Sequence, residues 1–338
     1  MQAVVWQGPR RMQIESVPIP TPEEREVLVR VHAVGICGSE ISGYLGQNSL
    51  RRPPLIMGHE FSGSVVAAPD VTGFAVGDRV TVNPMIPCGA CVLCRNGREN
   101  LCLNRSLIGA HRPGAFAEYV AVPAKACYAL PDTIDDIRGT LVEPTACALR
   151  AVELAGVAPA SAMLIQGAGP IGLLSLVVAL RAGASTVIVS DINPTRLGLA
   201  CAWGATHGIN PAERPLHDTV LALTDGMGVD AAIDAVGLPM TRKDAICAVR
   251  PGGRVVFIGL HEDETTVPAN HIVRSEITVQ GSFCYTQANF TGALRLLAHE
   301  FGPLDRSWIA MRPLGDADAS FAQLIDNPSA ATKIVLQP

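Results

Sequence analysis

The segment Gly167-Ala168-Gly169-Pro170-Ile171-Gly172 has the pattern GxGxxG, and it decides the fold. It follows an apolar run, Ala162–Gln166, that predicts a strand, and it opens an apolar stretch, Ile171–Ala182, that predicts a helix. The first glycine permits a tight turn, the second lets a pyrophosphate approach the backbone, and the third lets the helix pack against the strand. Free N–H groups at the helix N-terminus favour an anion, so the segment predicts a dinucleotide-binding site.

An acidic residue stands at the distance that such a site requires. Asp191 directly follows a second predicted strand, Thr186–Ser190, about 20 residues after the glycine motif. Its carboxylate can accept hydrogen bonds from both ribose hydroxyls and would repel a 2′-phosphate, which favours NAD over NADP. An ordinary strand–turn–helix junction capped by Asp191 is the alternative, and the agreement of motif, context and spacing disfavours it. Other expected coenzyme contacts are Gly259, Leu260, Ser282 and Phe283.

The pattern of apolar residues changes at about residue 145. Before it, short apolar runs broken by Gly and Pro, such as Val27–Val34 and Phe61–Ala68, predict a mainly β region. After it, strands alternate with helices, which predicts βαβ units and a parallel sheet. Further strands of that sheet are expected at Ala231–Ala235, Arg254–Ile258 and Ile277–Gln280. The tail after residue 285 holds one predicted helix, Phe290–Ala298, and could belong to either part.

Composition agrees with a turn-rich α/β protein of two domains. The 338 residues are 48% hydrophobic and 17% charged, with 32 Gly and 25 Pro, so a large core is possible. The net charge of −5 is spread along the chain without a basic stripe, and nucleic acid is not an expected partner. No apolar run approaches the roughly 18 residues of a membrane span, so no membrane association is expected. The N-terminal apolar run precedes its arginines, unlike a signal peptide, and we expect a cytoplasmic protein.

Four cysteines cluster within residues 84–105. Cys88, Cys91, Cys94 and Cys102 have the spacing C-x2-C-x2-C-x7-C, which lets one loop place several thiolates around one ion. Four thiolates complete the tetrahedral coordination of zinc, so this lobe predicts a structural zinc site. An iron–sulfur cluster and redox-active cysteines are the less favoured alternatives.

Three separate segments carry side chains that could hold a second metal ion. They contain Cys37 in GICGSE, His59 and Glu60 in GHE, and Glu143 in LVEP. A thiolate, an imidazole and a carboxylate can bind zinc and leave a position open for substrate. Taken singly, each residue also has an ordinary structural explanation, and the spacing alone does not decide between the two.

The order of these motifs resembles that of the zinc-dependent medium-chain dehydrogenases. GxCGS, GHE, the four-cysteine lobe, Glu-Pro and GxGxxG follow one another, and Phe116–Val120 also fits, so the match runs nearly end to end. The sequence looks most similar to the sorbitol (polyol) and threonine dehydrogenases, with related galactitol-phosphate enzymes. The resemblance implies an α/β protein with a GroES-like, mainly β catalytic domain (1–145) and a Rossmann domain with a doubly wound parallel sheet (146–285). It also implies that residues 286–338 return to complete the catalytic domain.

The resemblance further implies roles for individual residues. A catalytic zinc would be held by Cys37, His59 and one or both of Glu60 and Glu143, and Glu60 could instead tune the metal from outside its ligand set. Zinc lowers the pKa of a bound alcohol, which favours hydride transfer to the nicotinamide. Ser39 resembles the hydroxyl that takes the substrate proton, and Arg196 is implied on the adenine side. Two zinc ions and one NAD per chain, and a homotetramer, are thus expected.

The sequence departs from this pattern at two places that bear on substrate and proton transfer. Ser42 stands where many relatives have a His that carries the proton onward, so the proton path beyond Ser39 is open. Cys284-Tyr285 stands where sorbitol dehydrogenases commonly have Arg-Tyr. A thiol is a weaker donor than a guanidinium, so we expect a secondary alcohol beside another hydroxyl but poor use of sorbitol itself.

Other functions remain to be compared with an alcohol or polyol dehydrogenase. A sugar-phosphate alcohol or a threonine-like amino alcohol is a second substrate class within the same chemistry. A metal-free reductase of the same fold would not need Cys37, His59 and Glu143. A redox sensor that binds NAD and uses only the structural zinc would not need Cys37, His59 and Ser39. Zinc content separates these readings, with two ions per chain for the dehydrogenase and one or none for the others.

Overall fold

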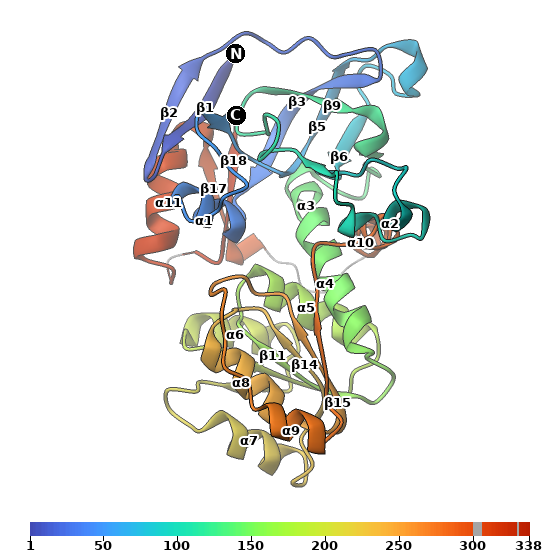
Figure 1. The fold of residues 1–338 in the computed structure, drawn as a ribbon. Coiled ribbons are helices and arrows are strands. Elements are labelled where there is room, and N and C mark those ends of the chain that lie inside the picture. The colour runs from blue at the N-terminus through green and yellow to red at the C-terminus, as the bar shows by residue number, and fades with distance from the viewer. Residues whose placement is uncertain (300–305, 330) are drawn as a thin grey trace. The chain divides into compact units, whose positions relative to one another are not determined.

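The computed structural model describes residues 1–299, 306–329 and 331–338, and their contacts form two compact units (Figure 1). The first unit contains Met1–Glu143 together with residues 293–299 and the described residues after 305. The second unit contains Pro144–Gly292. The second boundary lies seven residues beyond the expected one at Tyr285. Within the described residues, no helix is both long and apolar enough to cross a membrane.

The first unit is built on β-sheets. Its main sheet has the strand order β10-β6-β5-β3-β18-β17, with β9 also paired to β3. These strands are β3 (Glu26–Gly35), β5 (Glu60–Ala67), β6 (Arg79–Val82), β9 (Tyr119–Pro123), β10 (Cys127–Ala129), β17 (Ile309–Pro313) and β18 (Lys333–Gln337). A smaller sheet has the order β2-β1-β4, from β1 (Gln2–Gly8), β2 (Arg11–Ser16) and β4 (Leu55–Ile56), and a ribbon joins β7 (Met85–Ile86) to β8 (Ser106–Leu107).

Short helices complete the first unit. They are α1 (Gly38–Tyr44), α2 (Val92–Arg95), α3 (Asp136–Thr140) and α11 (Ala317–Asp326). Tyr44 at the end of α1 packs on Phe321 of α11, with ring centroids 5.0 Å apart. Phe116 contacts the same ring edge-on at 5.9 Å. The C-terminal segment therefore supplies both a strand beside β3 and a helix that packs against the end of α1.

The second unit is a parallel sheet with the strand order β13-β12-β11-β14-β15-β16. Its strands are β11 (Ala162–Gln166), β12 (Thr186–Ser190), β13 (His207–Ile209), β14 (Val229–Asp234), β15 (Val249–Phe257) and β16 (Thr278–Gly281). The helices between them are α5 (Pro170–Arg181), α6 (Pro194–Ala202), α7 (Leu216–Leu223), α8 (Pro239–Ala248) and α9 (Ala269–Arg274), preceded by α4 (Val142–Ala155) and followed by α10 (Gln287–Ala298). The order reverses between β11 and β14, and ligands of such sheets bind beyond the carboxyl ends of the strands at this point.

Burial explains why the strands of this sheet are continuous apolar runs. Leu164 and Ile188 pack on one face in a core that includes Leu216 of α7 and Ile246 of α8. Ile165, the next residue of β11, points to the opposite face of the sheet and is also fully buried, so that face is covered as well. Strands that are buried on both faces lose the alternation of apolar and polar residues. The expected fold class, a mainly β unit with a doubly wound parallel-sheet unit, is confirmed.

Candidate metal centres and coenzyme site

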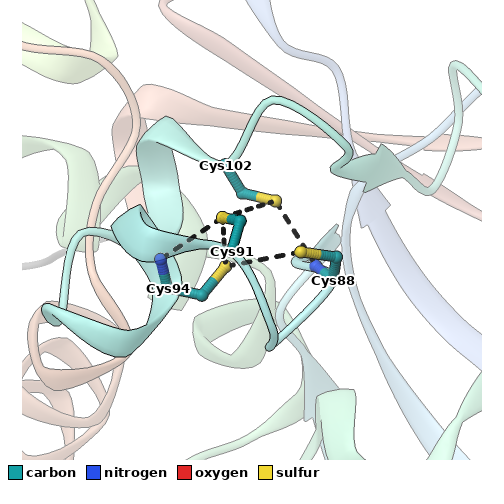
Figure 2. A group of neighbouring side chains, drawn as sticks. All are labelled: Cys88, Cys91, Cys94 and Cys102. Atoms are coloured by element: carbon teal, nitrogen blue, oxygen red, sulfur yellow. Dashed lines mark hydrogen bonds between the residues drawn. The ribbon is translucent and has the colours of Figure 1, made fainter.

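The four-cysteine lobe brings its thiols together in one loop. The Sγ atoms of Cys88, Cys91, Cys94 and Cys102 all lie within 4.8 Å of one another. Figure 2 shows the four side chains converging from α2 and the turns on either side of it. The β7–β8 ribbon closes the base of the loop, because Met85 pairs with Leu107 and Ile86 with Ser106.

Backbone N–H groups in the lobe point at sulfur. The N–H of Cys88 donates to the Sγ of Cys102 at 3.4 Å, and the N–H of Cys94 donates to the Sγ of Cys91 at 3.5 Å. N–H groups of Ala90 and Cys91 lower the pKa of the Cys88 thiol to about 6. Donors of this kind stabilise thiolates, the form that binds metal. Four clustered thiols with this environment fit the donor set of a closed, structural zinc site.

A second group of possible ligands is formed by Cys37, His59 and Glu60. Their donor atoms lie within 4.8 Å of one another, although more than 20 residues separate Cys37 from His59. Strand pairing explains the proximity. Cys37 caps α1 just after β3, His59 immediately precedes β5, and Gly35 pairs with Glu60 across these two antiparallel strands. One thiol, one imidazole and one carboxylate fit a zinc site that keeps a position open.

Glu40, which the sequence interpretation gave no role, holds this group in place. The side chain is fully buried on α1, and its Oε1 lies 2.8 Å from Nδ1 of His59. The same oxygen accepts from the N–H of Gly58 at 2.8 Å, and Oε2 accepts from the N–H of Cys37 at 3.1 Å. Burial raises the pKa of Glu40, but the charge and hydrogen bond of His59, with the Arg51 charge and the Cys37 N–H, together outweigh burial and hold the pKa below its usual range. With Nδ1 bonded to Glu40, His59 presents Nε2 to a metal ion.

Glu60 has a buried cationic partner that was also not foreseen. Lys333 of β18 is 2% exposed, forms an ion pair with Oε2 of Glu60, and donates to the carbonyl of Ile36 at 3.0 Å. Burial lowers the pKa of Lys333, but the charge and hydrogen bond of Glu60, together with the nearby Cys37 and Glu40, outweigh burial and keep the pKa raised. A Cβ on Gly35 would lie 2.5 Å from Oε2 of Glu60 and 2.9 Å from Cε of Lys333. A glycine at position 35 is therefore needed for this pair.

The other expected residues of the reactive site differ in position. Ser39 lies in the first turn of α1, with its Oγ 3.5 Å from Sγ of Cys37. Glu143 is buried at the start of α4, but it does not belong to the group of donor atoms that the described residues bring within 4.8 Å. The geometry therefore favours Glu60 over Glu143 as the carboxylate nearest to Cys37 and His59.

The glycine motif has the geometry that its three positions require. Gly167 follows β11 with φ +91°, a backbone conformation that disfavours side chains. A Cβ on Gly169 would meet nothing within 4 Å, so space is open above the backbone there. A Cβ on Gly172 would lie 1.8 Å from the carbonyl oxygen of Gly167, so only glycine allows α5 to approach the strand this closely. This cradle fits a pyrophosphate at the N-terminus of α5, where Pro170 and Ile171 form the first turn.

Asp191 lies directly after β12 and binds the glycine loop. Its Oδ2 accepts from the N–H of Ala168 at 2.6 Å, and its Oδ1 accepts from the N–H of Asn193 at 2.8 Å. Arg196 lies one turn into α6, whose N-terminus is capped by the Asn193 side chain. The carboxylate is thus held at the end of the strand next to the motif, where a ribose would be read.

The remaining coenzyme candidates lie after the next strands. Gly259 and Leu260 follow β15, and Ser282 and Phe283 follow β16. Asp234, at the end of β14, was not foreseen. It is fully buried and accepts from the N–H groups of Val236 at 3.0 Å and Gly237 at 3.1 Å. These bonds shape the loop at the point where the strand order reverses, beside the Gly259 turn.

Comparisons with known proteins agree with this geometry. Residues 23–132 match the model of the alcohol dehydrogenase GroES-like domain, and residues 170–299 match the model of the zinc-binding dehydrogenases. Sorbitol dehydrogenase of Bacillus subtilis is 36% identical over 293 residues, which is 84% of this chain and 82% of that protein. L-threonine 3-dehydrogenase of Pyrococcus horikoshii is 39% identical over 274 residues, covering 80% and 78% of the two chains.

A solved structure extends the likeness to the whole chain. A zinc-binding dehydrogenase from Sinorhizobium meliloti, in a crystal structure with bound NADP, has a TM-score of 0.91 and 36% sequence identity. The alignment covers 100% of this chain and 99% of that one.

Proposed function

Because the chain belongs to the zinc-dependent medium-chain dehydrogenase family, we propose that it oxidises a secondary alcohol beside a second polar group to a ketone, with NAD as hydride acceptor. The observation that carries the proposal is the open group of Cys37, His59 and Glu60. The same unit already contains a four-cysteine site that fits a structural zinc ion. The second group is therefore not needed as a structural site.

Each residue of this group has a defined task. Cys37, His59 and Glu60 would hold a zinc ion, which when bound acts as a Lewis acid that lowers the pKa of an alcohol. Glu40 fixes the ring of His59, and Lys333 offsets the charge of Glu60. The Ser39 hydroxyl accepts the proton of the substrate hydroxyl. Glu143 is retained as a second carboxylate of the site, and comparing the zinc content of Glu60→Gln and Glu143→Gln distinguishes direct ligation from a supporting role.

The chemistry of the relatives supports the substrate class. Sorbitol carries secondary hydroxyls beside other hydroxyls, and L-threonine carries its secondary hydroxyl beside an amine. A vicinal polar group is therefore common to both. After β16, Cys284 has a left-handed backbone with φ +48°, and Tyr285 is buried against Phe290. We expect a diol shorter than sorbitol, or a cyclic one, to be the better substrate. This expectation does not depend on the Tyr285 hydroxyl.

The proposed preference for NAD rests on Asp191. A carboxylate at the end of the second strand accepts hydrogen bonds from a ribose and repels a 2′-phosphate. The Sinorhizobium meliloti structure holds NADP, so this fold by itself does not exclude NADP. In this chain Asp191 therefore has to make the distinction, with Arg196 on the adenine side.

A panel of secondary and primary alcohols, polyols and amino alcohols tests the proposal when NADH formation is followed by absorbance. The proposal expects vicinal diols to be oxidised faster than simple alcohols. Equal oxidation of simple primary alcohols would refute the substrate class, and absence of turnover with every alcohol would favour the NAD-binding sensor. Sugar-phosphate alcohols and threonine belong in the panel as the second candidate class.

A cytoplasmic homotetramer is the proposed state of the protein. Strand β16 is one of the two edges of the second unit's sheet within the described residues, β13 being the other, and β16 exposes Val279 (36%). Val273 on the adjoining α9 is 75% exposed. An unpaired strand edge with exposed apolar residues favours pairing with another chain. Size-exclusion chromatography with light scattering tests this proposal, and a monomer would refute it.

A further inference from the structure

The Ser39 hydroxyl lies against a buried arginine that the family pattern does not explain. Nη2 of Arg51 donates to Oγ of Ser39 at 3.3 Å, and Nη1 donates to the Ser39 carbonyl oxygen at 3.0 Å. The Asn48 side chain donates to the same carbonyl at 3.5 Å. Both Nη atoms of the guanidinium therefore donate to Ser39, the residue proposed to take the substrate proton.

Arg51 is part of the interior and not a surface cation. Its residue exposure is 4%, whereas the neighbouring Arg52 is exposed. A Cβ on Gly43 would lie 2.6 Å from Cδ of Arg51, so α1 leaves room for this side chain. Glu40 is the nearby negative charge that favours a cation here, and Arg51 in turn contributes to lowering the pKa of Glu40. A buried guanidinium held in this way is fixed in direction as well as in charge.

The contact with Arg51 limits the hydrogen bonds that remain open to the Ser39 hydroxyl. A serine hydroxyl has one donor and two acceptor positions. Arg51 occupies one acceptor position, and in the structure the hydroxyl donates towards Sγ of Cys37. One acceptor position is left for an incoming hydroxyl group. The Ser42 hydroxyl donates to the Gly38 carbonyl of its own helix at 3.4 Å.

We propose that Arg51 is a positioning residue that aims the Ser39 hydroxyl at the substrate. The inference rests on the proposed function, because it assigns the Ser39 hydroxyl to the substrate. As the substrate O–H bond breaks, a new O–H bond forms on Ser39, and the proton that Ser39 held passes to a water molecule. Ser39 is therefore neutral before and after the transfer. Arginine has no acceptor atom and stays charged, so it carries no proton itself and only fixes the direction of the Ser39 hydroxyl.

Substitution of Arg51 tests the proposal. Arg51→Met keeps the length of the side chain and removes its charge, Arg51→Lys keeps the charge, and Arg52→Met is the matched change at the exposed neighbour. Loss of a hydrogen bond to a charged group predicts that Arg51→Met lowers kcat about 10- to 100-fold. The KM for NAD and the zinc content should not change, Arg51→Lys should recover part of kcat, and Arg52→Met should match the wild type.

A double-mutant cycle separates action through Ser39 from a purely structural role. If Arg51 acts through the Ser39 oxygen, then Arg51→Met should have little further effect once Ser39→Ala is present. Added guanidinium ion should restore part of the activity of Arg51→Ala. Equal losses in the wild-type and Ser39→Ala backgrounds, or equal losses in Arg51→Lys and Arg51→Met, would overturn the proposal. If the Arg51→Met variant does not fold, Arg51→Lys is compared in the wild-type and Ser39→Ala backgrounds in its place.

The failure of this inference can be told apart from failure of the proposed function. A wild-type protein that oxidises no alcohol contradicts the proposed function itself. A wild-type protein that oxidises a vicinal diol, with Arg51→Met as fast as Arg52→Met, contradicts only the role of Arg51.

Discussion

At the scale of single residues, the candidate reactive site depends on charged groups that carry no motif of their own. Glu40 binds His59, the Gly58 N–H and the Cys37 N–H, which belong to two segments of the chain. One buried carboxylate therefore holds the imidazole ligand and the loop of the thiol ligand in register. Support of this kind orients the ligands of a metal ion and raises their basicity.

Glu40→Gln is predicted to weaken zinc binding at the reactive site. The amide of Gln places an NH2 group where one carboxylate oxygen now accepts backbone or imidazole N–H groups, so at least one hydrogen bond is lost. We expect about a 10- to 100-fold loss of metal affinity, the usual effect of such changes. Zinc content after graded chelation measures it, with Glu24→Gln on the exposed loop before β3 as control. An unchanged zinc affinity would contradict the role of Glu40.

Asp191→Ala is predicted to reduce the preference for NAD. Loss of hydrogen bonds from the ribose to a carboxylate should weaken NAD binding about 10- to 100-fold. NADP binding should weaken less, because repulsion of the 2′-phosphate is removed at the same time. The bond from the Ala168 N–H is lost for both coenzymes, so the ratio of the two dissociation constants isolates the charge effect. Asp218→Ala on α7 is the control, and a wild-type protein without coenzyme preference would contradict the assignment.

Some of these residues could be predicted from the sequence and others could not. The three glycines and Asp191 were predictable because their roles depend on the adjacent backbone, which the local sequence specifies. Lys333 was not, because its partner Glu60 is 273 residues away and only the pairing of β18 with β3 brings them together. Arg51 and Glu40 were missed for a similar reason, since α1 itself was not predicted.

At the scale of elements, five of the six strands of the parallel sheet overlap a strand that the sequence predicts, and β13 was not predicted. β11 and β12 have the predicted bounds. Their residues are buried on both faces or alternate regularly, so local hydrophobicity specifies them. Helix α1 was not predicted, because its seven residues GSEISGY show almost no apolar periodicity. It is stabilised by its N-terminal capping by Glu40 and by packing of Tyr44 on α11.

The contact between α1 and α11 leads to a prediction on pH. The Tyr44 hydroxyl donates to Oδ1 of Asp318 at 2.9 Å, and burial, followed by Asp318, raises the pKa of Tyr44 to about 12. The neutral phenol is therefore favoured by folding. This contribution is complete below about pH 10, the usual pKa of tyrosine, and is lost as the pH rises towards 12.

Tyr44→Phe tests this contact. The substitution should lower the free energy of unfolding by roughly 1–3 kcal/mol at neutral pH, because Asp318 loses a donor. The difference from the wild type should shrink as the pH rises from 10 to 12. Chemical denaturation at several pH values measures it, with Tyr119→Phe on β9 as the matched control. A difference that stays constant over this range would show that the hydroxyl contributes no pH-dependent stability.

At the scale of the whole molecule, the chain has two groups of possible metal ligands that are built differently. The cysteine lobe uses four thiols from one loop, and the other group takes Cys37, His59 and Glu60 from the junctions of β3 and β5. Cys94→Ser should therefore destabilise the lobe and reduce zinc there. His59→Ala should leave the lobe and its zinc in place, because no residue of the lobe contributes to the second group.

Zinc content and NADH formation, measured together on wild-type protein and His59→Ala, test the central claim most directly. The account predicts two zinc ions per chain and NADH formation from a vicinal secondary diol for the wild type. For His59→Ala it predicts one zinc ion per chain, an unchanged fold by circular dichroism, and no NADH above background. Full NADH formation by His59→Ala after loss of that zinc ion would contradict the account.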